Sequence, residues 1–330
     1  MPNSTNPNSK FAMAPRGTGP TVSRDERWVA ETETEDVLTR DQLLPDSAPT
    51  GMWGNAWKQL RRRPLFWVAS TIIVLTILVA LFPGLFSQAD PRAADLHNSL
   101  APARSGHPFG FTLQGYDVYA RTVYGARASV LTGLLTTIFV TILGVIIGSV
   151  AGYLGGWVDA ILSRLTDIMF AIPLLLAGIV LMQMFSVRNT FTVVFVLSIF
   201  GWPQMARVVR SAVLSTKNND YVAASRALGL SKAGILFRHI LPNCLASIIV
   251  MATTSLGIYI VAEATLSYLG IGLPPTVVSW GNDISTAQST LRVAPSNLFY
   301  PATALALTVL GFILLGDTLK DALDPKERTR

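Results

Sequence analysis

The 330-residue sequence has a single cysteine, Cys244, and only three histidines, His97, His107 and His239. One cysteine cannot form an intrachain disulfide, and a cysteine-based zinc cluster is excluded as well. The histidines are too far apart in the sequence for a metal-binding motif. The sequence also lacks a G-x-x-x-x-G-K-[ST] phosphate loop, an H-E-x-x-H motif and a Ser/His/Asp arrangement. We therefore expect a chain that is not an enzyme, with no metal and no cofactor of its own.

Charge is scarce too. Charged residues make up 14% of the sequence and hydrophobic residues 50%, whereas soluble domains carry about 25% charged residues. The net charge is +6, but the surplus of Lys and Arg lies in loops beside long apolar runs. That pattern is typical of an inner-membrane protein and argues against a nucleic-acid partner.

A helix of about 20 apolar residues crosses the core of a bilayer. Six such runs predict an all-α membrane protein with six transmembrane helices. The runs cover residues 66–86, 129–151, 165–185, 190–214, 242–266 and 298–315.

The runs divide the chain into four parts. Residues 1–50 are polar and rich in Pro, Ser and Thr, which predicts a disordered cytoplasmic tail. Residues 51–128 hold the first span and a long extracytoplasmic segment. Residues 129–318 form the core domain with five spans, and residues 319–330 form a cytoplasmic C-terminal tail.

Loop charges predict the orientation, because positive residues favour the cytoplasm. The short loops on one side hold only Arg188 and Arg292, and cations concentrate on the other side, so we expect both termini in the cytoplasm. The segment 87–128 carries four arginines on the outer side, but long loops follow this rule poorly. The cations on the inner side are Arg207, Arg210, Lys217, Arg226, Lys232, Arg238, Lys320, Lys326, Arg328 and Arg330.

Two prolines fall inside predicted spans. Pro173 lies in the third span, and Trp202-Pro203 interrupts the fourth. Proline removes a backbone hydrogen bond and kinks a helix, and transporters use helices that are broken within the membrane. Pro173 and Pro203 are therefore candidates for a helix break or gate, with a purely structural role as the alternative.

The outer segment ends in a stretch that begins a helix. Asp117 can cap this helix, and helical spacing brings Arg121, Tyr124 and Arg127 together, which predicts an amphipathic helix on the membrane surface. The segment is either a lid over the outer helix ends or a docking surface for a partner outside the membrane. Tyr116, Asp117, Arg121 and Arg127 are the candidate contacts.

Charged residues also occur close to the spans. Glu263 lies toward the outer end of the fifth span, where it either pairs inside a dimer of subunits or reaches the headgroups. Near the cytoplasmic interface we expect anchoring or inter-helix pairs among Asp167, Arg207, Arg210 and Asp317.

The loop between the fourth and fifth spans reads KNNDYVAASRALGLSKAGILFRHILPN. Asp220 can cap a short helix over residues 221–228, on which three alanines form a small-residue surface. Gly229 ends that helix in a left-handed conformation, and Ser231 can cap a second helix that runs to His239. Pro242 suits the first turn of the next span. The result is a knob that projects from the membrane; a simple connector is the alternative.

This loop resembles the coupling loop of ABC-type importer permeases, whose pattern is E-A-A-x-x-x-G followed by a fixed gap and a proline. Ala224, Gly229 and Pro242 fall on that pattern. Further stretches resemble the dipeptide, oligopeptide and nickel branch, and the chain most resembles its second (C-type) permease over residues 52–326. These stretches are HPFG at 107–110, VYGAR at 123–127, AGYLGGWVD at 151–159, RLTD at 164–167, LGIG at 269–272 and LDP at 323–325.

The sequence departs from the family pattern at three positions. Ala223 replaces the glutamate that opens the coupling pattern, and Ser225 replaces its second alanine. Asp220 or the partner permease is therefore expected to supply the acidic contact. In the outer segment Tyr116 stands where the family has arginine, so contact with the binding protein is expected to differ.

The resemblance implies the type I importer permease architecture, with cytoplasmic coupling helices between spans four and five. A substrate-binding lipoprotein delivers a dipeptide or oligopeptide to a path that this chain forms with a second (B-type) permease, and two ATPase subunits hold ATP and Mg. The implied coupling residues are Asp220, Tyr221, Ala223, Ala224, Arg226, Ala227, Leu228, Gly229, His239 and Pro242.

Other functions stay open at this point. The same architecture could import nickel chelates, haem or glutathione-like compounds. An ion-coupled secondary transporter and a structural membrane anchor are alternatives from other classes. Membrane lipids are expected partners in every case.

Overall fold

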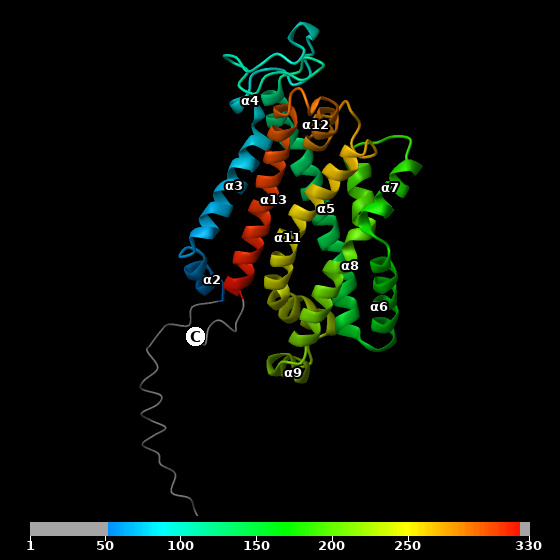
Figure 1. Ribbon diagram of the computed structural model, residues 1–330. Coiled ribbons are helices and arrows are strands. Elements are labelled where there is room, and N and C mark those ends of the chain that lie inside the picture. Colours follow the sequence, from blue (N-terminus) through cyan, green and yellow to red (C-terminus); the bar gives the residue numbers. More distant parts are fainter. Residues whose placement is uncertain (1–51, 324–330) are drawn as a thin grey trace, which may run out of the picture. The chain divides into compact units, whose positions relative to one another are not determined.

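The computed structural model describes residues 52–323 of the chain (Figure 1). The predicted N-terminal tail, residues 1–50, lies outside the described residues, and so do Lys326, Arg328 and Arg330. The long helices are α3 (Pro64–Leu81), α5 (Val118–Leu154), α6 (Gly156–Ala171), α8 (Thr190–Thr216), α11 (Leu241–Tyr268) and α13 (Ser296–Leu323). The shorter helices are α2 (Met52–Leu60), α4 (Pro83–Phe86), α7 (Leu174–Met184), α9 (Asp220–Ala227), α10 (Lys232–Ile235) and α12 (Trp280–Ala287).

Five stretches of helix in this part of the chain are long and apolar enough to cross a bilayer: α3, α5, α8, α13 and the run Lys232–Tyr268 that ends in α11. Helices α6 and α7, joined at a bend of 83°, make a sixth candidate if they cross together. The prediction of an all-α membrane fold is confirmed for the described residues, with five or six candidate spans against the six predicted. The long helices run side by side, with α9 at one end and α12 at the other, here named the α9 end and the α12 end (Figure 1).

The start of α5 differs from the prediction. We expected a separate amphipathic helix on the membrane surface, but one unbroken helix runs from Val118 to Leu154. Asp117 caps it as predicted, since its Oδ1 accepts hydrogen bonds from the backbone N–H groups of Tyr119 and Ala120. The expectation was wrong because polar side chains in the first turns of α5 bind other parts of the same chain. They do not need to lie at a membrane surface, so the helix need not break before the span begins.

Three glycines allow α5 to pack closely against α8. Gly144, Gly148 and Gly152 recur every fourth residue and so lie on one face of the helix. A Cβ at Gly152 would lie 2.9 Å from the carbonyl oxygen of Arg210, and one at Gly148 would lie 2.9 Å from Cβ of Val209. Small residues at such a spacing let two helix backbones approach each other inside a membrane.

Substitution of Gly148 by valine is expected to destabilise this helix pair by about 1–3 kcal/mol, the range for overpacking a well-packed core. Thermal unfolding of the purified protein in detergent measures the effect. Gly54 in α2 is the matched control, because nothing lies within 4 Å of a Cβ placed there. An equal loss of stability in both valine variants would show that helix propensity, and not the contact with α8, is responsible.

Glu263 of α11 is enclosed within this one chain. Its side chain is 0% exposed, and the Ser267 hydroxyl donates a hydrogen bond of 2.8 Å to Oε1. It therefore does not reach the headgroups, and it needs no second subunit to be buried. Both sequence-based alternatives for this residue are replaced by a buried polar contact within α11.

Candidate functional site

The predicted knob is present at the α9 end. Helix α9 comprises Asp220–Ala227, and Leu228 is its C-cap residue. Gly229 has a φ of +81°. Its backbone N–H donates to the carbonyl of Arg226 at 3.1 Å, and the N–H of Leu230 donates to that of Ser225 at 3.2 Å. This pair of bonds defines a Schellman motif, which explains why a glycine stands at this position.

The second half of the knob begins as predicted. The Ser231 hydroxyl accepts a hydrogen bond from the N–H of Gly234 at 3.1 Å and so caps α10. A π-helical turn, Leu236–Ile240, then joins α10 to α11, so the second helix does not end at His239 but continues without a break into the next span. Pro242 lies in the first turn of α11. The chain therefore turns from the knob into the next span without an intervening loop.

The position of Asp220 differs from the prediction. Asn219 occupies the N-cap of α9, and Asp220 is the first residue of the helix with its side chain exposed. A carboxylate in the first turn still interacts favourably with the helix dipole. Its exposure leaves it available to a partner.

A buried apolar contact holds the knob in place. Val222 of α9 and Ile235 of α10 are buried in one cluster with Val213 near the end of α8, Ile240 of the π-helical turn and Cys244 of α11. Rigid attachment follows, because close-packed interiors transmit displacement rather than absorb it.

The outer surface of the knob is apolar and small. Leu228 is 81% exposed at the tip, and Ala223, Ala224 and Ala227 are exposed along α9. Tyr221 and Arg226 are exposed beside them, whereas His239 is half-buried. A surface with small side chains and one protruding leucine suits insertion into a groove of another protein.

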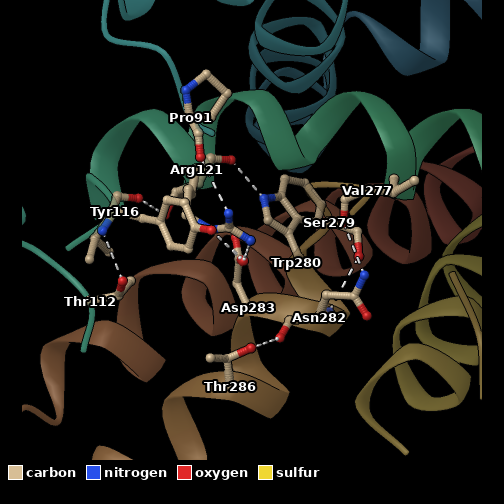
Figure 2. A network of polar contacts seen from close by, with 12 residues as sticks. Pro91, Thr112, Tyr116, Arg121, Val277, Ser279, Trp280, Asn282, Asp283 and Thr286 are labelled. Carbon is tan, nitrogen blue, oxygen red and sulfur yellow. Dashed lines mark hydrogen bonds and ion pairs between the residues drawn. The ribbon is translucent and has the colours of Figure 1, made fainter. Parts of the chain in front are cut away.

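At the α12 end, two of the four candidate partner contacts, Asp117 and Arg121, are tied to other parts of this chain; Figure 2 shows Arg121 beside Tyr116 and Asp283. Asp117 is buried, caps α5 and pairs through Oδ2 with His107 Nδ1 at 2.5 Å. Arg121 forms an ion pair with Asp283 of α12, and its guanidinium lies 4.7 Å from the centre of the Tyr116 ring. Arg127 is exposed. We therefore withdraw Asp117 and Arg121 as docking residues.

The Arg121–Asp283 pair links helices that are far apart in the sequence. The two side chains are 12% and 9% exposed, and Nε of Arg121 donates to Oδ1 of Asp283 at 2.8 Å. Burial raises the pKa of the Asp283 carboxyl, while the guanidinium of Arg121 acts in the opposite direction. The indole N–H of Trp280 adds a hydrogen bond of 2.8 Å to the carbonyl of Thr122. Asp283 was missed from the sequence, because no local pattern identifies its partner.

The two prolines of interest meet at one cavity. Pro173 separates α6 from α7 at the 83° bend, so a helix break occurs there as predicted. Helix α8 instead continues through Pro203, and the predicted interruption is wrong. Pro203 is buried, and Tyr259 donates a hydrogen bond to the nearby carbonyl of Gly201 at 3.1 Å, which stabilises this turn. Both prolines line a cavity of about 190 Å³ with Tyr259.

Charged residues near the α9 end form inter-helix pairs, as expected. Arg207 of α8 pairs with Asp167 of α6 at 3.3 Å. Arg210 donates to both carboxylate oxygens of Asp159, at 2.5 and 2.7 Å, a bidentate arrangement that the sequence did not reveal. Asp317 is exposed on α13. These pairs connect the broken span to α8.

These features define a class of protein: a multi-pass helical membrane protein with a rigid helical knob between two spans. Comparison with known proteins gives the family. Residues 144–329 match the family described as "Binding-protein-dependent transport system inner membrane component". Residues 51–103 match the "N-terminal TM domain of oligopeptide transport permease C".

Curated relatives agree over most of the chain. The oligopeptide transport system permease protein OppC of Bacillus subtilis (strain 168) is 41% identical over 84% of this chain and 90% of its own length. The dipeptide permease DppC of Alkalihalophilus pseudofirmus is 36% identical over 84% and 91%. The glutathione permease GsiD of Shigella flexneri is 37% identical over 86% and 93%. The chain belongs to the binding-protein-dependent permease family and is a transmembrane subunit of an ABC importer.

Proposed function

We propose that this subunit and a second, B-type permease form the path by which dipeptides or oligopeptides enter the cell, and that α9 couples this path to ATPase subunits. The observation that carries the proposal is the knob, in which a left-handed Gly229 and a buried anchor hold an exposed small-residue helix. A rigid knob can transmit the closure of a nucleotide-bound ATPase dimer to the spans, whereas a soft loop would absorb it. Peptide substrates are favoured by the names of the OppC and DppC relatives.

The proposal includes an orientation and a set of partners. The α9 end carries most of the loop cations, and positively charged loops favour the cytoplasmic side of a membrane. We therefore place the α9 end in the cytoplasm and the subunit in the inner membrane. Both termini then lie inside. ATP and Mg are held by two ATPase subunits, and a substrate-binding lipoprotein approaches the α12 end, where Arg127 and Tyr116 remain as candidate contacts.

The helix break at Pro173 is proposed to lie at the translocation path. Backbone that is not helical at membrane depth is tolerated only where protein or water covers it. The bend between α6 and α7 and the adjoining cavity supply such a place, beside the stretch of α8 around Pro203. We assign Pro173 to the gate and Pro203 to the support of the helix behind it.

A glutathione-like substrate is the second candidate, because GsiD is 37% identical over 93% of its length. Uptake competition separates the two classes: excess dipeptide should block uptake if peptides are the substrate, and excess glutathione should block uptake if a glutathione-like compound is the substrate.

Affinity capture from native membranes tests the function. We expect the tagged chain to co-purify with a second permease, ATPase subunits and a lipoprotein, and mass spectrometry of the ligand retained on that lipoprotein should identify a peptide. Recovery of this chain alone as an active, ATP-independent transporter in liposomes would contradict the proposal and favour an ion-coupled mechanism.

A further inference from the structure

A group of cations near the start of the described chain lies beside exposed tryptophans. Lys58 is on α2, and Arg61 and Arg62 are in the turn between α2 and α3; all three side chains are exposed. Trp57 and Trp67 on either side are 52% and 53% exposed. We call these five residues the basic aromatic turn.

The local geometry of the turn is fixed. The backbone N–H of Arg61 donates to the carbonyl of Trp57 at 3.1 Å, and the indole N–H of Trp67 donates to the carbonyl of Arg61 at 3.1 Å. Phe66 stands between the tryptophans, with its ring centre 5.9 Å from that of Trp57 and 5.6 Å from that of Trp67. The cations are therefore presented from an ordered turn.

The next arginine along the chain has a different role. Arg63 forms an ion pair of 2.5 Å with Asp321 of α13, and this pair ties the turn to the end of that helix. Leu60 and Phe66 are buried in one cluster with Ala322 of α13. No Asp or Glu occurs between residues 52 and 89 in the sequence. The positive charge of Lys58, Arg61 and Arg62 is thus not balanced by acidic residues of its own segment.

The surface next to the turn is apolar. Helix α3 is one of the candidate spans, and its first turns expose Leu65, Val68, Val74 and Leu75. Tryptophans are enriched where a span meets the headgroups. An acidic soluble protein would match the cations but not the apolar face of α3. A phospholipid matches both surfaces, because its phosphate can bind the cations while its acyl chains contact the exposed face of α3.

We propose that the basic aromatic turn binds the headgroup of an anionic phospholipid. Guanidinium groups bind phosphate oxygens through paired hydrogen bonds, and each Lys or Arg near an anionic leaflet contributes about 1 kcal/mol. This site does not depend on the proposed substrate or on the coupling role of α9.

Native mass spectrometry of the delipidated complex tests the site by titration with phosphatidylglycerol, and with phosphatidylcholine of the same acyl chains. We expect phosphatidylglycerol to bind preferentially. The double variant R61Q/R62Q should bind it about 30-fold more weakly, from two contributions of about 1 kcal/mol each. The matched control is R164Q/R292Q, which removes two exposed cations from other parts of the described chain and should bind as the wild type does.

Further arms separate other occupants. Inorganic phosphate at the same concentration should not displace the lipid; displacement would indicate a simple anion site and overturn the proposal. Equal binding of both lipids, or equal binding to wild type and R61Q/R62Q, would overturn it too. If the complex with R61Q/R62Q lost its ATPase subunits but bound phosphatidylglycerol as the wild type does, the turn would be a contact for a protein partner and the lipid proposal would be wrong.

Discussion

Replacement of Gly229 by valine is expected to lower ATP-driven transport at least about 10-fold while the spans still insert and the complex still assembles. Gly229 has a φ of +81°, and an L-residue in this region costs roughly 1–2 kcal/mol, with β-branched residues among the least tolerant. Nothing lies within 4 Å of a Cβ at this position. The strain therefore falls on the backbone that ends α9 and orients Leu228. Transport and substrate-stimulated ATPase activity in reconstituted vesicles measure the effect.

Two controls isolate the cause. Gly229→Asn should retain most of the coupling, because asparagine adopts the left-handed conformation more readily than other residues with a Cβ. Gly270→Val introduces the same conflict at the opposite end, since Gly270 has a φ of +75° and open space around it; coupling should survive there. Normal substrate-stimulated ATPase activity in Gly229→Val would contradict the proposal that the shape of this turn couples closure of the ATPase dimer to movement of the spans.

Much of the knob could be predicted because its determinants are local. The left-handed Gly229, the cap at Ser231 and the position of Pro242 each depend on neighbours within a few residues. The spans could be predicted for a similar reason, since length and hydropathy suffice. The prediction of Asp220 as the cap failed by one position: Asn219 occupies the N-cap of α9, although its side chain makes no capping hydrogen bond.

The outer end could not be predicted, because its determinants are distant in the sequence. Arg121 was expected at a membrane surface, but its partner Asp283 lies 162 positions further along the chain. The carboxylate of Glu263 was assigned to a dimer or to the headgroups, although a serine one turn away binds it. A sequence pattern shows that a polar side chain needs a partner, but the partner itself becomes visible only when the helices are packed.

The pair of Arg121 and Asp283 gives the second large expected effect. Arg121→Met is expected to destabilise the protein by about 3–5 kcal/mol, because the buried Asp283 carboxylate then loses its counter-charge. The melting temperature should fall by on the order of 10 °C. Thermal unfolding of the purified complex in detergent, followed by intrinsic fluorescence, measures the loss. Arg127→Met is the matched control on the same helix, because Arg127 is exposed, and its effect should stay within about 0.5 kcal/mol.

The double variant Arg121→Met/Asp283→Leu distinguishes an uncompensated charge from a lost contact. If the single variant fails because a carboxylate is stranded in a buried site, removal of that carboxylate should restore most of the stability, as replacement of buried ion pairs by apolar residues often does. If the ion pair instead fixes the geometry of α12 against α5, the double variant should remain as unstable as the single one. The first outcome is expected, because the hydrogen bond from Trp280 to the carbonyl of Thr122 independently holds α12 against α5.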